Sequence, residues 1–288
     1  MKYAVYVPIF GPYGDARVLI DLARTVEQAG WDGFFIWDQI TGFSADNVAD
    51  TEVALAAIAL NTERIRLGSM ITPLARRRPA KYAREMLTID HLSNGRLICG
   101  VGLGVSPEEF GDLGDEADPK VRAEQLDESL DVITGLWRGE KFSYNGKHYT
   151  IKDATFLPAP VQKPRIPIWV AGTWPVKAPF RRAAKWDGVF PMFRGQQIGQ
   201  MMPPDEYRPL IAFIQEQRQT DAPFDIAHAG HTPNDPTQAA EIVRPYAEVG
   251  VTWWMESVDP WSYGGDTPAE SWPVDAMRER IISGPPKF

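Results

Sequence analysis

The sequence is poor in the residues that build disulfide-linked or metal-bound folds. Its 288 residues include a single cysteine, Cys99, and four histidines. One cysteine excludes an internal disulfide and any zinc site built from cysteines. No apolar run approaches the roughly 20 residues that a membrane-spanning helix needs, so no membrane partner is expected. The first eight residues look like a strand rather than a signal peptide, which predicts a cytoplasmic protein.

Positive charge is also in short supply, because 30 lysines and arginines stand against 38 aspartates and glutamates. The resulting net charge of -8 argues against nucleic-acid binding, which needs a basic surface for the phosphates. Aromatic residues, in contrast, make up 11% of the chain. They supply either a large core or a pocket for a flat ligand.

Short apolar runs alternate with helical patterns along the whole chain. The runs expected to form strands are 3–8, 34–37, 66–71, 97–102, 166–171, 188–191, 225–229 and 251–255. A helical pattern follows each run, which predicts an α/β fold, a (β/α)8 TIM barrel forming a single domain over residues 1–288. A doubly wound open sheet is the alternative, but its glycine fingerprint is missing after the first strand.

One segment interrupts this alternation, between the fourth helix and the fifth strand. Asn145 and Gly146 stand between alternating aromatic residues, which is a strong hairpin signal. We therefore expect an excursion from the barrel before strand five.

The active site of such a barrel lies at the C-terminal ends of its strands, the mouth of the barrel. Asp38 is the acid best placed there to move a proton, with Glu256 behind it. The alternative for Asp38 is a helix cap or a loop salt bridge. The side chains expected to line the substrate side are Tyr6, Phe10, Trp37, Gln39 and Trp253. This mainly apolar wall suits a small uncharged carbonyl, alkene or aromatic substrate better than a sugar phosphate.

Other polar residues at the strand ends have competing interpretations. Gly172 and Thr173 precede a helix and could hold a phosphate, or they could form an ordinary turn. The arginine run at 76–78 is either a solvated loop or an anion contact. His228 and His231 are three residues apart on a strand and point to opposite faces, so no metal site is expected.

Several motifs, in the right order over nearly the whole chain, resemble the bacterial luciferase-like family. They are Pro73-Leu74-Ala75-Arg76-Arg77-Arg78-Pro79, Leu92-Ser93-Asn94-Gly95-Arg96, Gly100-Val101-Gly102-Leu103-Gly104, Pro158-Ala159-Pro160, Ile166-Pro167-Ile168-Trp169-Val170-Ala171-Gly172 and Gly250-Val251-Thr252-Trp253-Trp254.

The resemblance implies a barrel that binds FMN, or the deazaflavin coenzyme F420, at its mouth. It implies a non-prolyl cis peptide near Ser69-Met70-Ile71 that supports the flavin ring, and a phosphate site after strand five. It also implies a homo-oligomer, a dimer. The cofactor-binding residues then expected are Met70, Ile71, Thr72, Gly102, Gly104, Gly172, Thr173 and Trp174.

Two positions depart from the family pattern. Gln39 stands where deazaflavin members often have a histidine, and Val105 stands near the glutamate of members that oxidise sugar phosphates. The first hypothesis is therefore an oxidoreductase that uses FMN on a small organic substrate, with O2 if it is a monooxygenase. The alternatives are F420-dependent hydride transfer and a flavin-binding barrel without catalysis. A hydrolase is disfavoured, because no metal-ligand or nucleophile–base set is present.

Overall fold

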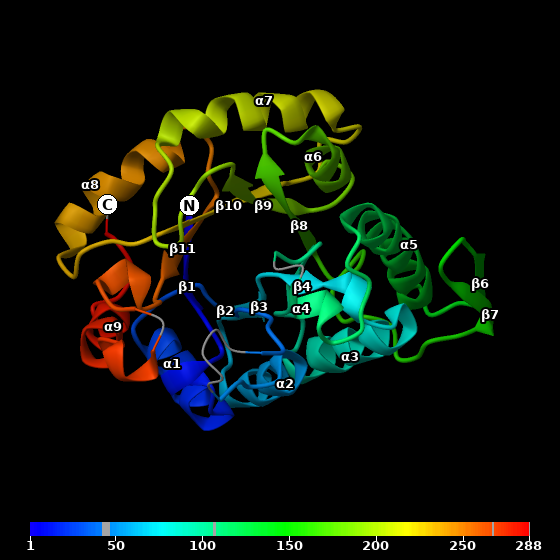
Figure 1. The fold of residues 1–288 in the computed structure, drawn as a ribbon, viewed down its shortest axis with the longest axis horizontal. Helices are drawn as coiled ribbons and strands as arrows, with labels where there is room; N and C mark the ends of the chain where they lie inside the picture. The colour runs from blue at the N-terminus through cyan, green and yellow to red at the C-terminus, as the bar shows by residue number, and fades with distance from the viewer. Residues whose placement is uncertain (42–46, 106–107, 267, 288) are drawn as a thin grey trace.

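The computed structural model describes residues 1–41, 47–105, 108–266 and 268–287. Parallel strands form a ring in these residues, and helices surround it, as the sequence predicts (Figure 1). The ring strands are β1 (Lys2–Val7), β2 (Gly33–Ile36), β3 (Arg66–Ser69), β4 (Thr72–Pro73), β5 (Cys99–Gly102), β8 (Ile168–Trp174), β9 (Gly188–Phe193), β10 (Asp225–Gly230) and β11 (Trp253–Ser257).

The order of these strands shows how the ring closes. They pair in the order β3-β2-β1-β11-β10-β9-β8-β5-β4. β3 lies within the predicted third strand, 66–71, and the short β4 follows directly after that range. A parallel bridge between Leu67 of β3 and Leu97, just before β5, joins the two ends. The predicted α/β barrel is therefore confirmed as a nearly closed TIM-like barrel.

Helices cover the outside of the ring, and four of the longer ones begin at an aspartate cap. Asp15, Asp50, Asp118 and Asp235 each accept a backbone N–H of the first turn, which satisfies one of the free donors there. The helices are α1 (Ala16–Gln28), α2 (Thr51–Asn61), α3 (Pro79–Leu92), α4 (Glu108–Gly111), α5 (Pro119–Trp137), α6 (Lys177–Ala183), α7 (Tyr207–Gln217), α8 (Pro236–Glu248) and α9 (Val274–Ile282).

The predicted excursion is a two-stranded hairpin. β6 (Phe142–Asn145) and β7 (Thr150–Ala154) pair antiparallel and project beyond α5, away from the ring (Figure 1). The hairpin lies far from the mouth, so it does not contribute to the candidate site. Across the described part of the chain, no helix combines the length and apolar character needed to cross a bilayer.

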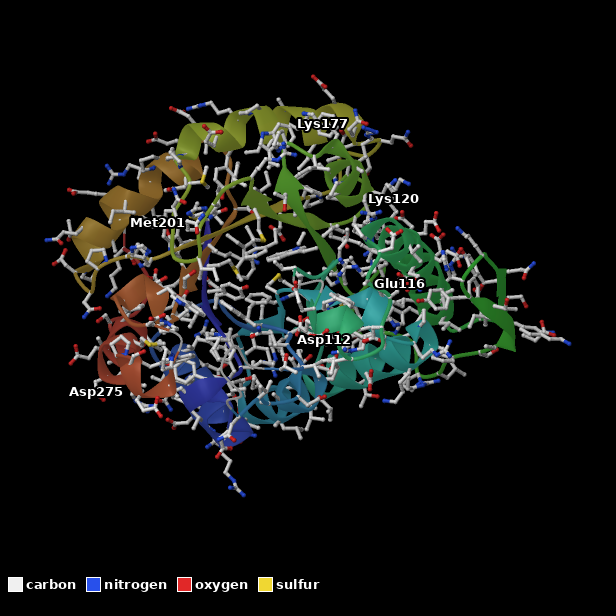
Figure 2. The ribbon with its side chains drawn as sticks, viewed as in Figure 1. Asp112, Glu116, Lys120, Lys177, Met201 and Asp275 are labelled. Carbon is white, nitrogen blue, oxygen red and sulfur yellow. The ribbon has the colours of Figure 1, made fainter. Side chains whose placement is uncertain are left out.

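Buried side chains form two clusters, one on each face of the ring. The outer cluster joins the strands to the helices. The inner cluster takes its members from strands all around the ring, so it fills the barrel axis; it consists of Ala4, Phe35, Met70, Ile98, Trp169, Phe190, Ala227, Trp253 and Met255. Figure 2 shows side chains occupying the interior of the ring. Because side chains alternate along a strand, these residues fix which positions face inward.

Candidate functional site

The inner face changes character toward the C-terminal ends of the strands. The lower positions hold large side chains such as Trp169 and Trp253, which are almost completely buried. The next inward positions, Ala171 and Ala229, are small and only partly buried. The barrel is therefore packed toward the N-terminal ends of its strands, and small side chains line the mouth at β8 and β10. Trp253, predicted to contact substrate, lies in the packed lower layer.

The third strand breaks at the mouth, between β3 and β4. The peptide between Met70 and Ile71 is cis, as the family resemblance predicts. The Tyr6 hydroxyl donates to the carbonyl oxygen of Met70 at 2.8 Å. Burial raises the pKa of the Tyr6 hydroxyl, which keeps it protonated as a donor. Tyr6 of β1 thus holds the cis peptide from two strands away in the ring.

Glycine 102 allows the side chain of Ile71 to lie over β5. A Cβ atom at Gly102 would stand 2.4 Å from Cδ1 of Ile71, closer than real contacts allow. Thr72, the next predicted cofactor residue, is buried, and its hydroxyl lies 2.7 Å from that of Ser69. These contacts fix an apolar platform, formed by Met70, Ile71 and Gly102, at the mouth.

An aromatic wall stands beside this platform. The ring of Trp37 lies 5.7 Å from that of Tyr6 and stacks at 6.0 Å on Trp261. Phe10 is completely buried behind Trp37, at a ring distance of 6.0 Å. The indole nitrogen of Trp37 and the side-chain oxygen of Gln39 are buried without a hydrogen-bond partner. A bound molecule with a hydroxyl or carbonyl group would satisfy such atoms.

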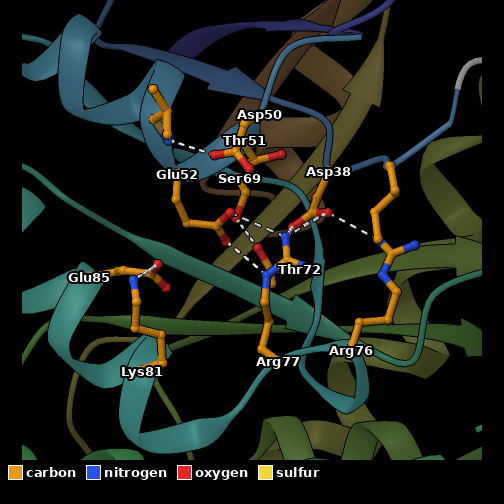
Figure 3. Close-up of polar contacts among 12 residues, drawn as sticks. Asp38, Asp50, Thr51, Glu52, Ser69, Thr72, Arg76, Arg77, Lys81 and Glu85 are labelled. Carbon is orange, nitrogen blue, oxygen red and sulfur yellow. Dashed lines mark hydrogen bonds and ion pairs between the residues drawn. The ribbon is translucent and has the colours of Figure 1, made fainter. Parts of the chain in front are cut away.

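Asp38, predicted to be catalytic, lies in a buried cluster of acids and arginines. Its carboxylate accepts from Arg76 at 3.0 Å and from Arg77 at 3.0 Å, and its side chain is fully buried. Arg77 also pairs with Glu52 at 3.2 Å (Figure 3). Arg76 pairs with Glu109 at 2.9 Å. Burial raises the pKa of Asp38, while the charges of Arg77 and Arg76 oppose that shift. The contacts of Asp38 are therefore those of a buried salt bridge, the alternative expected from the sequence. A role of Asp38 in proton transfer stays a prediction.

Glu256 does not lie at the mouth, contrary to the expectation. Its carboxylate accepts from the Trp254 indole at 2.8 Å and from the Thr232 hydroxyl at 2.8 Å. Arg280 of α9 forms an ion pair with it at 3.2 Å, so the group lies between the strands and a helix. Glu256 follows the inward-facing Met255 by one residue, which turns its side chain outward.

The end of β8 divides the predicted phosphate residues between the two faces. Thr173 is exposed and shares the face of Trp169 and Ala171. Gly172 points outward, where a Cβ atom would stand 2.3 Å from Pro179 of α6. Trp174 also turns outward and packs its ring 5.3 Å from that of Phe180. The structure therefore brings Thr173 to the mouth and leaves Trp174 among the helices.

The last predicted glycine supports the loop after β5. Gly104 has a φ of +77°, a backbone conformation that residues with a side chain rarely adopt. A Cβ atom there would stand 2.5 Å from the ring of Phe110 in α4. Gly104 therefore allows α4 to pack close to the end of β5.

Two ionisable residues at the mouth are not among the acid–base candidates predicted from the sequence. His231 follows β10 and Asp259 follows β11, and both positions continue the inward-facing register of their strands. The sequence motif of His231 suggests only a metal ligand, which the strand alternation excludes. Every second residue of a strand faces the same side, so this alternation, continued past the strand ends, is the signal that could have identified both residues.

These features define a barrel with a flat apolar platform, an aromatic wall and few unpaired charges at its mouth. The family of luciferase-like monooxygenases matches residues 1–253, so the chain belongs to this family. The family contains flavin-dependent and F420-dependent oxidoreductases.

Known relatives are of both kinds. An F420-dependent glucose-6-phosphate dehydrogenase of Microbacterium testaceum is 32% identical over 170 residues, which cover 58% of this chain and 48% of that one. The chain thus matches about half the length of this dehydrogenase. An F420-dependent secondary alcohol dehydrogenase has the same fold, with a TM-score of 0.75, 15% identity and 98% of each chain covered. The FMN-bound 3,6-diketocamphane monooxygenase of Pseudomonas putida has a TM-score of 0.65 at 20% identity, covering 86% of this chain and 73% of that one.

Proposed function

We propose that the protein is an F420-dependent oxidoreductase that transfers a hydride between the coenzyme and a small organic substrate. The sequence likeness to F420-dependent glucose-6-phosphate dehydrogenases, at 32% identity, carries this proposal. It supports the alternative raised from the sequence better than FMN-dependent monooxygenation. When bound, the deazaflavin supplies the hydride chemistry, and the protein supplies binding and orientation.

The residues at the mouth fit a flat deazaflavin ring. Ile71 is partly exposed, and the absence of a side chain at Gly102 leaves the space that its Cδ1 atom needs. Met70 and Ile71 would lie against the ring, and the Tyr6 hydroxyl fixes the peptide between them. Thr173, exposed on the same face of the barrel, would hold the phosphate.

The contacts around the mouth support a small uncharged alcohol or carbonyl compound as substrate. Trp37 and Gln39 each carry a buried polar atom without a partner, one a donor and one an acceptor. Arg76 and Arg77 are already paired with acids, so neither offers a free charge to a sugar phosphate. We therefore place the substrate nearer to a secondary alcohol or ketone than to glucose-6-phosphate.

Fluorescence titration with F420 and, separately, with FMN tests the cofactor. We expect a Kd for F420 in the micromolar range or below, and a Kd for FMN at least ten-fold higher. Tighter binding of FMN than of F420 would overturn this proposal and favour an FMN-dependent oxidoreductase. Binding of neither would remove the oxidoreductase assignment.

Reduction of F420, followed by its loss of absorbance, tests the substrate class. 2-Propanol and glucose-6-phosphate are suitable probes, because one is a small neutral alcohol and the other carries a phosphate. We expect turnover of 2-propanol and none of glucose-6-phosphate. The reverse result would overturn the substrate class and leave the cofactor assignment intact. The homodimer and the cytoplasmic location stay predictions.

A further inference from the structure

His231 is the first residue after β10, and the pattern of that strand turns its side chain into the barrel. Ala227 belongs to the inner cluster and Ala229 packs against it. Thr232 instead bonds to Glu256 on the outer face, through its backbone N–H at 2.7 Å and its hydroxyl at 2.8 Å. Alternation along the strand therefore places the imidazole of His231 at the mouth.

The surroundings of this imidazole leave it poised for a ligand. The residue is half-buried, and its Nδ1 atom is buried without a hydrogen-bond partner. Its backbone N–H donates to the sulfur of Met201 at 3.4 Å. Met201 lies in the loop after β9 and is labelled in Figure 2. The backbone is thus held while the ring keeps hydrogen-bonding capacity, which a bound molecule would use.

Asp259 gives this histidine a charged neighbour. It lies two residues beyond β11, is 3% exposed, and its carboxylate accepts from the backbone and hydroxyl of Ser262 at 2.9 and 3.1 Å. Burial raises the pKa of Asp259, and the Ser262 bonds and the positive charge that His231 can carry oppose that rise. Asp259 also interacts electrostatically with Tyr6. Three neighbouring strands, β10, β11 and β1, therefore bring His231, Asp259 and Tyr6 to one side of the mouth.

The other three histidines are placed elsewhere. His91 is exposed on α3 and His148 lies on the hairpin. His228 is completely buried on the outer face of β10, where its Nδ1 atom is hydrogen-bonded to the hydroxyl of Tyr207. His231 is thus the one histidine of this chain at the mouth.

We propose that His231 is the catalytic acid–base residue of this site. This inference rests on the proposed function. When an alcohol is oxidised, the substrate carbon gives up its hydrogen with both electrons to the deazaflavin. The O–H bond breaks in the same reaction, its electron pair forms the carbonyl, and the proton passes to a ring nitrogen of His231. Reduction of a ketone returns that proton to the carbonyl oxygen.

This assignment supplies a proton-exchanging group although no histidine follows the second strand. Gln39 stands at that position and cannot exchange a proton near neutral pH. Asp38 and Glu256 are both paired with arginines. An imidazole titrates nearest to neutral pH of the common side chains, which suits a group that must both accept and donate.

A protection experiment tests whether His231 faces the cofactor and substrate. Diethyl pyrocarbonate modifies accessible neutral imidazoles, and peptide mass spectrometry reports each of the four histidines separately. We expect F420 together with 2-propanol or acetone to slow modification of His231 at least ten-fold. The rates at His91 and His148 should not change, and His228 should stay unmodified throughout. Equal modification of His231 with and without these ligands, under conditions where F420 is bound, would overturn the proposal.

Variants then test the proton transfer itself. His231→Ala should lower kcat with 2-propanol by roughly 10²- to 10⁴-fold, while the Kd for F420 stays within about three-fold. Added imidazole should restore part of the lost rate, because it can occupy the vacated space and accept the proton. His91→Gln is the matched control and should behave as the wild type.

Normal turnover in His231→Gln would overturn the proposal. If F420 itself fails to bind the wild type, the proposed function fails first, so the two failures are distinguishable.

Discussion

The ends of β2 and β10 carry ionisable side chains that point in opposite directions, although both strands end at the same rim. Phe35 of β2 faces inward, and Asp38, three residues later, turns outward to Arg76 and Arg77. Ala227 of β10 faces inward, and His231, four residues later, also faces inward. A residue that lies an odd number of positions after an inward-facing residue points toward the helices. A residue that lies an even number of positions after it points into the mouth.

The end of β11 shows both cases on one strand. Glu256 is three residues beyond the inward-facing Trp253 and pairs with Arg280. Asp259 is six residues beyond Trp253 and lies near His231. An acid at a strand end is therefore not by itself a catalytic candidate. Its spacing from the inner cluster separates an acid that points toward the helices from one that points into the barrel.

The largest effect is expected from breaking the outward-facing pair of β11. Arg280→Met leaves Glu256 buried without its cationic partner, and this should lower the free energy of unfolding by roughly 3–5 kcal/mol. Urea denaturation measures the change. Arg278→Met on the same helix is the control, because Arg278 pairs with Asp21 at an exposed site and should contribute at most about 1 kcal/mol. Equal losses in the two variants would contradict the distinction drawn between these faces.

Asp38→Asn tests whether the β2 acid behaves like Glu256 or like a catalytic group. As an outward-facing anchor, Asp38 should affect stability strongly, because the variant leaves Arg76 and Arg77 without one of their acids. If it instead moves a proton, turnover should fall by about 10²- to 10⁴-fold while stability changes little. We expect the first result, measured by thermal unfolding and by kcat on the same samples. Asp205→Asn, at an exposed pair with Arg208, is the control.

Thr173→Ala tests whether an even spacing also places a side chain at the mouth in β8. Thr173 is four residues beyond the inward-facing Trp169. A hydrogen bond to a charged phosphate contributes about 1.5–3 kcal/mol, so the Kd for F420 should rise by roughly ten- to a hundred-fold. Thr150→Ala on the hairpin should leave the Kd unchanged. An unchanged Kd for Thr173→Ala would place the phosphate elsewhere.

The alternation of strands and helices could be predicted because it depends on local sequence. The same holds for the hairpin at Asn145 and Gly146, whose turn chemistry is local. The partners of Asp38 and Glu256 could not be predicted, because Arg76 is 38 residues away in the chain and Arg280 is 24 residues away. The inward position of His231 was within reach of the sequence, since Ala227 and Ala229 mark the small inward-facing side of that strand.

The smallest expected effect, counted per pH unit, is the pH dependence that His228 of β10 gives to stability. Burial lowers the pKa of His228 to about 3, against about 6.5 in an unfolded chain. Between these values the unfolded chain binds a proton that the folded protein does not, so stability falls as the pH falls from about 6.5 toward 3. Each pH unit in this window should lower the free energy of unfolding by up to about 1.4 kcal/mol.

His228→Gln removes this contribution, so its free energy of unfolding should fall less steeply with acid, by up to that same amount per unit. The slope is the informative readout, because the loss of the stacking between His228 and Tyr246, at a ring distance of 4.2 Å, lowers stability at every pH. His91→Gln, at an exposed position, should keep the wild-type slope. If His228→Gln also keeps it, the imidazole of His228 takes up its proton in the folded protein, and the outward face of β10 is less closed to protons than its packing indicates.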